Sequence, residues 1–331
     1  MSAQVDERKP LSPDDVLPPV EPPSAGFIVQ LFIVPAVMVS IIVAVWLAFN
    51  WLARASEDPH AYIRQLQRDN NLRWQVAVNL ANALRNPRND SLREDREFAK
   101  ELAAMLEGEL ASGRQSDEDV KLRLYLCKVL GEFSIADGLP TLLKVAATER
   151  SEQEVEVRWA ALGAIALLAD NMKAKGQLAH ADLHAVLMQA AGDEKAIIRS
   201  AAAFALGVMG DEPSLARLEV MLADAHPDVR YNAATGLARH GKAVCADVLA
   251  EMLDPLEMAG VEAEGREGSR EFKRALIQVN ALRAVGQLTA ANADLEVDPL
   301  REAIRKLLAA SPNLEIQVRA KEVLHQISQT R

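Results

Sequence analysis

Aromatic residues are scarce in this sequence. They make up 4% of the 331 residues, whereas hydrophobic residues as a whole make up 50%, with Ala and Leu prominent among them. Strands favour aromatic and β-branched side chains, while Ala and Leu are strong helix formers. The composition therefore predicts closely packed helices, and the length leaves room for one to three ordinary domains.

Cysteines are also few, and positive charge is not in surplus. Cys127 and Cys245 lie far apart, each inside a helical pattern, so we interpret both as small buried hydrophobic residues rather than as a disulfide or a reactive thiol. Lys and Arg number 37 against 47 Asp and Glu, which gives a formal net charge of −10. Nonspecific binding of nucleic acid needs an excess of cations, so this balance argues against a nucleic-acid partner.

Motifs for catalysis and cofactor binding are missing as well. The GKA run at 241–243 lacks the glycine spacing and the hydroxyl residue of a phosphate-binding loop, and GVMG at 207–210 follows no strand. His180 and His184 are spaced to share a metal on a helix, but they lack the Glu of HExxH and a third ligand, so solvent-facing histidines are the simpler interpretation. We therefore expect no catalytic residue, metal, cofactor or small-molecule substrate.

Two segments at the N-terminus differ in composition from the rest. Residues 1–26 contain six prolines, several acids and almost no large hydrophobic residues, which predicts a disordered tail. Residues 27–49 carry no charge, and as a helix they would span about 35 Å, enough to cross a bilayer. Trp46 and Trp51 suit the headgroup region. We predict a transmembrane helix within residues 27–53.

Other interpretations of this hydrophobic run stay open. Residues 53–55 have the small-x-small form of a signal-peptide cleavage site, although the run exceeds the usual ~7–15 residues. A buried core helix is a second alternative. Four arginines fall between positions 54 and 73, whereas only Arg8 and Lys9 precede the run, so the positive-inside rule places the C-terminal part in the cytoplasm. The reverse orientation would make it an extracytoplasmic interaction module.

One helical pattern recurs from about residue 58 to the C-terminus. Its clearest copies are IRSAAAFALGVMG at 198–210 and VRYNAATGLARHG at 229–241, each followed by a second helix. The position that usually holds Arg falls at 73, 123, 158, 199, 230, 278 and 319, with Gln at 278. Two helices per repeat with this period are typical of an α-solenoid, in which each hairpin covers its apolar stripe by stacking on its neighbours. Gly210 and Gly241 are predicted to end helices in the left-handed conformation.

Residues 119–331 resemble HEAT repeats, in particular the short bacterial kind found in phycobilisome-lyase-like proteins. The resemblance is carried by 228–230 (Asp-Val-Arg) with Ala233, Ala234 and Leu237, and by Gly207 and 210–211 in the preceding copy. It implies an all-α, right-handed α-solenoid of stacked helical hairpins, preceded here by one transmembrane helix. HEAT repeats as a class bind other macromolecules and rarely perform chemistry.

The resemblance also implies a structural role for the repeated arginines. In the family, an acid of the turn and the Arg commonly form a ladder between neighbouring repeats. Carried onto this sequence, the ladder consists of Arg123, Arg158, Arg199, Asp228, Arg230 and Arg319. Gln278 interrupts it because an amide cannot replace the charged guanidinium.

Irregular spacing separates several parts of the helical region. Residues 54–118 are predicted to form an irregular N-terminal repeat or cap, and 119–331 the solenoid. An insertion at 86–119 contains an amphipathic helix of its own, and an acidic, glycine-containing insertion at 254–271 is predicted to be a mobile loop. Insertions in solenoids sometimes carry the binding function, although solvated loops are the simpler interpretation.

An aromatic residue directly follows the repeated Arg in three copies, giving Trp74, Trp159 and Tyr231. On its helix, Tyr231 would point away from the apolar stripe and therefore toward a neighbouring repeat or the concave surface. We predict these three residues as candidate partner-binding residues, with burial between repeats as the alternative.

The expected function is that of a membrane-anchored, noncatalytic scaffold, adaptor or assembly factor that holds a protein partner near the bilayer. An alternative, implied by the repeat subtype, is a lyase-like or chaperone-lyase protein that acts on a protein-bound cofactor.

Overall fold

The computed structural model describes residues 24–54, 59–68, 70–148 and 151–329. The chain divides into two compact units, Met1–Asp58 and Pro59–Arg331. Of the predicted tail, residues 1–23 lie outside the described residues.

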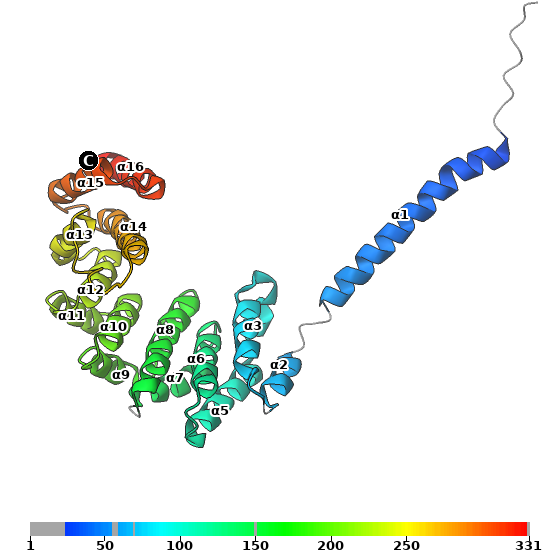
Figure 1. The fold of residues 1–331 in the computed structure, drawn as a ribbon, viewed down its shortest axis with the longest axis horizontal. Helices are drawn as coiled ribbons and strands as arrows, with labels where there is room; N and C mark the ends of the chain where they lie inside the picture. Colours follow the sequence, from blue (N-terminus) through cyan, green and yellow to red (C-terminus); the bar gives the residue numbers. More distant parts are fainter. Residues whose placement is uncertain (1–23, 55–58, 69, 149–150, 330–331) are drawn as a thin grey trace, which may run out of the picture. The chain divides into compact units, whose positions relative to one another are not determined.

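One long helix, α1 (Ala25–Arg54), forms the described part of the first unit (Figure 1). Its span Val29–Phe49 has a mean hydropathy of 2.7, and no part of this span is buried. The Ser40 hydroxyl donates a hydrogen bond to the carbonyl of Ala36 (2.8 Å), so this side chain adds no unpaired donor to the apolar surface. By length and composition, α1 is able to cross a membrane.

The second unit is a row of helices in two layers (Figure 1). The inner helices line the concave side of the row: α3 (Arg73–Arg85), α6 (Asp117–Gly131), α8 (Val155–Met172), α10 (Ala196–Met209), α12 (Pro227–Arg239), α14 (Glu267–Ala291) and α16 (Leu314–Gln329). The outer helices are α2 (Pro59–Leu66), α5 (Arg96–Ser112), α7 (Leu139–Ala147), α9 (Leu183–Ala190), α11 (Glu212–Met221), α13 (Ala246–Leu253) and α15 (Asp298–Ala310). Short helical turns connect them: η1 (Pro87–Asn89), α4 (Asp90–Arg93), η2 (Ala136–Gly138), η3 (Glu152–Glu154) and η4 (Ala243–Cys245).

Packing between the layers follows one rule throughout the row. Each outer helix packs against the inner helix that follows it, and consecutive inner helices pack against each other. Every regular element that the structure describes is a helix. The predicted all-α solenoid of stacked hairpins is therefore confirmed.

Small residues set the spacing of the inner helices. A Cβ atom added to Gly207 of α10 would lie 2.7 Å from the Cα of Gly236 in α12, so the two backbones are in direct contact. Gly131 of α6 makes a similar contact, because its Cβ would lie 2.8 Å from the Cα of Ala164 in α8. Close packing of this kind needs residues without bulk at the crossing point.

The predicted helix stops and buried cysteines are found in the structure. Gly210 (φ 65°) and Gly241 (φ 71°) both adopt the left-handed conformation, which L-residues with a Cβ rarely tolerate. Cys127 and Cys245 are buried and form no disulfide. Burial raises the pKa of both thiols, that of Cys245 to about 12, so neither is a reactive thiolate near neutral pH.

The two stretches set apart by their spacing are both part of the packed structure. Within 86–119, α5 buries Phe98, Leu102 and Leu106 and takes its place in the outer layer, so this stretch supplies a helix of the repeat rather than a loop. The longer spacing arises from η1 and α4.

The acidic stretch at 254–271 also packs against its neighbours. Helix α14 begins within it, at Glu267. Val261 is buried, and Gly260 lies so close to Tyr231 that an added Cβ would be 2.9 Å from the tyrosine ring. The backbone carbonyl of Glu264 accepts a hydrogen bond from Arg270 Nε (2.7 Å). The predicted loop thus corresponds to residues 254–266, and Gly260 and Val261 hold it against α12 and α14.

Replacing Gly207 by Ala tests the contact between α10 and α12. The added methyl group has to separate two backbones, so we expect the free energy of unfolding to fall by about 1–3 kcal/mol. Gly163→Ala in α8 is the matched control, because its Cβ would meet no atom within 4 Å. Ala favours helix over Gly by up to about 1 kcal/mol, so the control should be neutral or stabilising. Equal losses in denaturant unfolding of both variants would contradict the contact.

Candidate functional site

Arginines of the inner helices connect successive turns of the solenoid by ion pairs, here called rungs. The five pairs are Arg73–Glu109 (2.6 Å), Arg123–Glu154 (2.5 Å), Arg158–Asp193 (2.6 Å), Arg199–Asp224 (2.8 Å) and Arg230–Glu251 (2.5 Å). Each guanidinium also donates to a backbone carbonyl that precedes its own helix in the sequence: Leu66, Arg114, Ala146, Asp193 and Asp224, respectively. One arginine side chain thus links two neighbouring repeats. It pairs carbonyl and carboxylate oxygens, and buried polar groups of this kind need hydrogen-bond partners.

The rungs are charge-assisted hydrogen bonds at partly or fully buried positions. Arg199 donates to both carboxylate oxygens of Asp224, at 2.8 and 2.9 Å. The hydrogen bond with Arg199 holds the pKa of Asp224 below its ordinary value, and the same contact raises the pKa of Arg199. Both groups therefore stay charged across the physiological pH range, and the pair persists.

The structure brings most, but not all, of the arginines assigned to the ladder into rungs. Arg123, Arg158, Arg199 and Arg230 each hold one. Within the part of the chain that the structure describes, Arg319 on α16 forms no ion pair. It therefore holds no rung.

Asp228 is not the acid of a rung. Its carboxylate faces Lys273 of α14 (3.2 Å), while Asp224, four residues earlier, pairs with Arg199. The difference has a geometric cause, because Asp228 lies in the first turn of α12 rather than in the preceding turn.

Sequence reasoning identified Arg73 as a copy of the repeated position but did not assign it to the ladder, and it missed the acids of all five rungs. The arginines recur at one place in the pattern, whereas their acids follow at separations of 21 to 36 residues. A partner at so variable a distance leaves no spacing signal. Three of the acids lie between α-helices, whereas Glu109 lies in α5 and Glu251 in α13, so identifying them requires the three-dimensional arrangement of the repeats.

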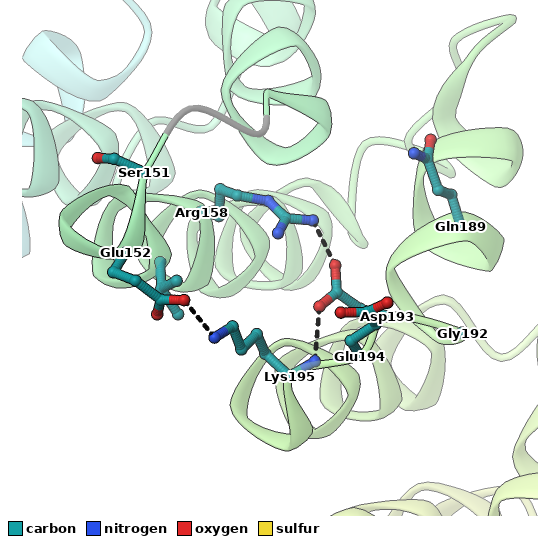
Figure 2. A pocket seen from close by; sticks show the side chains of 9 residues that line it. Ser151, Glu152, Arg158, Gln189, Gly192, Asp193, Glu194 and Lys195 are labelled. Carbon is teal, nitrogen blue, oxygen red and sulfur yellow. Dashed lines mark hydrogen bonds and ion pairs between the residues drawn. The ribbon is translucent and has the colours of Figure 1, made fainter.

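A cavity of about 580 Å³ opens beside one rung, at the turn between α9 and α10 (Figure 2). Lys195 Nζ lies 2.6 Å from Glu152, and the backbone N–H of Lys195 donates to Asp193 (2.8 Å), which also pairs with Arg158. Its hydrogen bond to Glu152 raises the pKa of Lys195. Because the charges neutralise one another across the turn, we assign this cavity to the rung system.

The two histidines weighed as metal ligands have separate partners. His184 Nε2 lies 2.8 Å from the carboxylate of Asp211, whereas His180 Nδ1 faces the backbone N–H of Asp182 at 3.2 Å. Among the described residues, no group of three His, Cys, Asp or Glu side chains is arranged to hold a metal ion.

The three aromatic residues predicted to bind a partner occupy different environments. Trp74 stacks on Tyr125 of the next inner helix, with ring centroids 6.0 Å apart. Trp159 is 40% exposed, and Lys128 Nζ lies 5.7 Å from the centre of its ring. Tyr231 is only 4% exposed, and its hydroxyl donates to Glu251 at 3.0 Å. Tyr231 therefore belongs to the packing between repeats, and the three do not form one exposed stripe.

A second cavity, of about 410 Å³, runs along α12 between α10 and α14, and we call it the inner groove. Thr235 and Asn232 of α12 lie in it, and Trp159, Ile197, Phe204 and Leu276 supply large, exposed apolar side chains from α8, α10 and α14. Helix α12 packs more extensively against α10 than against α14. Gly260, in the segment after α13, contacts both Tyr231 of α12 and Ile277 of α14. This segment therefore packs between the two helices, which explains why α12 packs less extensively against α14.

Sequence reasoning also missed most of the inner groove. Ile197, Phe204 and Leu276 are ordinary apolar residues that lie outside the buried stripes of their helices. A large apolar side chain on the solvent face of an amphipathic helix is the sequence signal that could have identified these groove residues.

Alanine substitutions distinguish the packing role of Tyr231 from the exposed position of Trp159. Tyr231→Ala should lower the free energy of unfolding by about 3–5 kcal/mol, because it leaves a cavity in the core. Trp159→Ala should cost clearly less, on the order of 1–2 kcal/mol, since much of its surface stays in water. Thermal and denaturant unfolding measure both values. A larger loss for Trp159→Ala than for Tyr231→Ala would contradict these placements.

Comparison with known proteins agrees with this geometry. The profile of a family described as HEAT repeats matches residues 152–238 and 184–257. The structure of human deoxyhypusine hydroxylase in complex with glycerol is similar at 17% identity over 82% of this chain and 96% of that chain, with a TM-score of 0.32, a likeness too weak to carry an argument. No curated protein matches the sequence. The phycobilisome-lyase-like subtype is not confirmed. Residues 152–257 of this chain therefore contain HEAT repeats.

Proposed function

We propose that this protein is a membrane-anchored, noncatalytic scaffold that binds a segment of another protein in the inner groove. The observation that carries the proposal is the gathering of exposed apolar side chains in one concave place. Ile197, Phe204 and Leu276 are each between 44% and 49% exposed, and Trp159 stands beside them. Large apolar side chains that line a shared cavity are typical of binding grooves.

The repeat architecture supports a binding role of this kind. A solenoid presents an extended concave surface, and its inner helices hold the lining side chains in place. The rungs add rigidity to the same helices, because Arg158 and Arg199 fix α8 and α10 to the turns that follow, and Arg230 fixes α12 to α13. A groove built on fixed helices loses little entropy when a partner binds.

Helix α1 supplies the second part of the proposal. If it spans a bilayer, it confines the solenoid to the membrane surface and raises its effective concentration toward membrane-bound partners. By the positive-inside rule, the arginines that follow the hydrophobic span support a cytoplasmic position for the solenoid. The proposed partner is a protein, and the proposal includes no metal, cofactor or small-molecule substrate.

Site-specific photo-crosslinking in native membranes tests this function. A photoreactive amino acid replaces Phe204 in the groove or, as matched control, Val220, which is 64% exposed on the outer helix α11. We expect one recurrent polypeptide adduct from position 204 and none from position 220, because only the groove holds the partner. The adduct should weaken when residues 1–54 are deleted, since the tether is lost.

The same experiment has outcomes that contradict the proposal. Equal adducts from both positions would show unspecific contact, and no polypeptide adduct from position 204 would leave the groove without a protein partner. Extraction of the full-length protein from membranes by alkaline carbonate would contradict the anchoring role of α1.

A further inference from the structure

We infer that the segment bound in the inner groove is an acidic, amphipathic peptide, with carboxylates that face Arg239 and Arg283 and an apolar side chain held between α10 and α14. This inference rests on the proposed function, because it specifies the chemistry of the partner. It follows from the distribution of charge in the groove.

Cations outnumber acids among the residues that line the groove. Arg239, Arg283 and Lys273 are cationic, and Asp228 is the one acid in the lining. Lys273 Nζ lies 3.2 Å from Asp228 and 3.7 Å from Glu264, so this lysine is already neutralised. Neither Arg239 nor Arg283 has a carboxylate within ion-pair distance among the described residues. Two positive charges of the groove are therefore uncompensated.

The charge of the groove is opposite in sign to that of the whole molecule. The protein carries a formal net charge of −10, whereas the groove lining holds three cations and one acid. A local excess of arginine in an acidic protein attracts anionic partners and repels cationic ones. Arg is also the side chain best suited to bind a carboxylate through two parallel hydrogen bonds.

The charges are arranged along the groove rather than scattered over it. Asp228 lies in the first turn of α12 and pairs with Lys273, whereas Arg239 is the last residue of α12 and has no acidic partner among the described residues. The neutralised pair and Arg239 are therefore about 16 Å apart along the helix. The apolar side chains of Phe204 and Leu276 come from the helices on either side. A peptide that fits this pattern carries an apolar anchor and acids toward one end.

A further cation lies next to Trp159 of the groove. Lys128 of α6 lies over the ring of Trp159, which lines the groove, and the same lysine lies 5.0 Å from the ring centre of Tyr125. Among the described residues, its ammonium group has no acidic partner. The backbone of a nucleic acid would need a longer row of cations than this groove holds, so two arginines among apolar side chains favour an acidic peptide.

Peptide selection on the full-length protein in lipid nanodiscs tests the inference. The probe is a phage-displayed library of random peptides about 12 residues long, which is enough to follow the groove. We expect the selected peptides to be enriched in Asp and Glu together with Leu, Ile, Phe or Trp. The variant Arg239→Glu/Arg283→Glu should lose these binders, with affinity reduced about tenfold or more.

Two controls accompany the selection. The variant Arg305→Glu/Lys306→Glu changes the net charge equally on the outer helix α15 and should leave the affinity unchanged. Phe204→Ala should weaken the selected peptides without altering their acidic character. A single-stranded oligonucleotide is the competing probe, and we expect it not to displace them.

The other outcomes of the selection contradict either the acidic character of the peptide or the proposed function itself. Selected peptides that require Phe204 but show no acidic enrichment, or that bind the Arg239→Glu/Arg283→Glu variant equally, overturn the inference and leave the groove as a peptide site. Preferential binding of the oligonucleotide overturns it in favour of nucleic acid. Failure to select any peptide overturns the inference, and if position 204 also gives no adduct in membranes, the proposed function fails as well.

Discussion

Close contact between neighbouring inner helices is the constraint on which the rest of this structure depends. At Gly207 and Gly236 two backbones touch, and the small residues around this crossing let α10 and α12 stack without a gap. The outer helices then cover the remaining apolar surface, each against the inner helix that follows it. Where this contact relaxes, between α12 and α14, a cavity opens. The packing thus accounts for both the rigid stack and the position of the groove.

The rungs and the inner groove use arginine in two ways. In the rungs, burial of a guanidinium is offset by an acid and by backbone carbonyls, and the pair fixes the turn. In the groove, Arg239 and Arg283 remain without an acid of their own among the described residues. The arginines of the rungs are therefore paired within the fold, whereas Arg239 and Arg283 are available to the proposed partner. This contrast supports a recognition surface rather than a further element of the scaffold.

The scaffold could be predicted from sequence because its signals are local and repeated. The IRSAAAFALGVMG and VRYNAATGLARHG copies mark helix, close contact and cap, and the structure has the caps at Gly210 and Gly241. Only part of the site could be predicted. Tyr231 points away from its own apolar stripe, but its burial depends on a segment about 30 residues later, at Gly260. The rung acids and the groove depend on contacts between turns, which no single repeat encodes.

Hydrogen exchange of the full-length protein in nanodiscs, with and without a bound peptide, tests the central claim most directly, namely that the concave face of the stack binds a polypeptide. The account predicts slower amide exchange in the inner helices α10, α12 and α14, and unchanged exchange in the outer helices α9, α11 and α13. Protection of the outer helices, or of the turn at 193–195 with the inner helices unchanged, would contradict it.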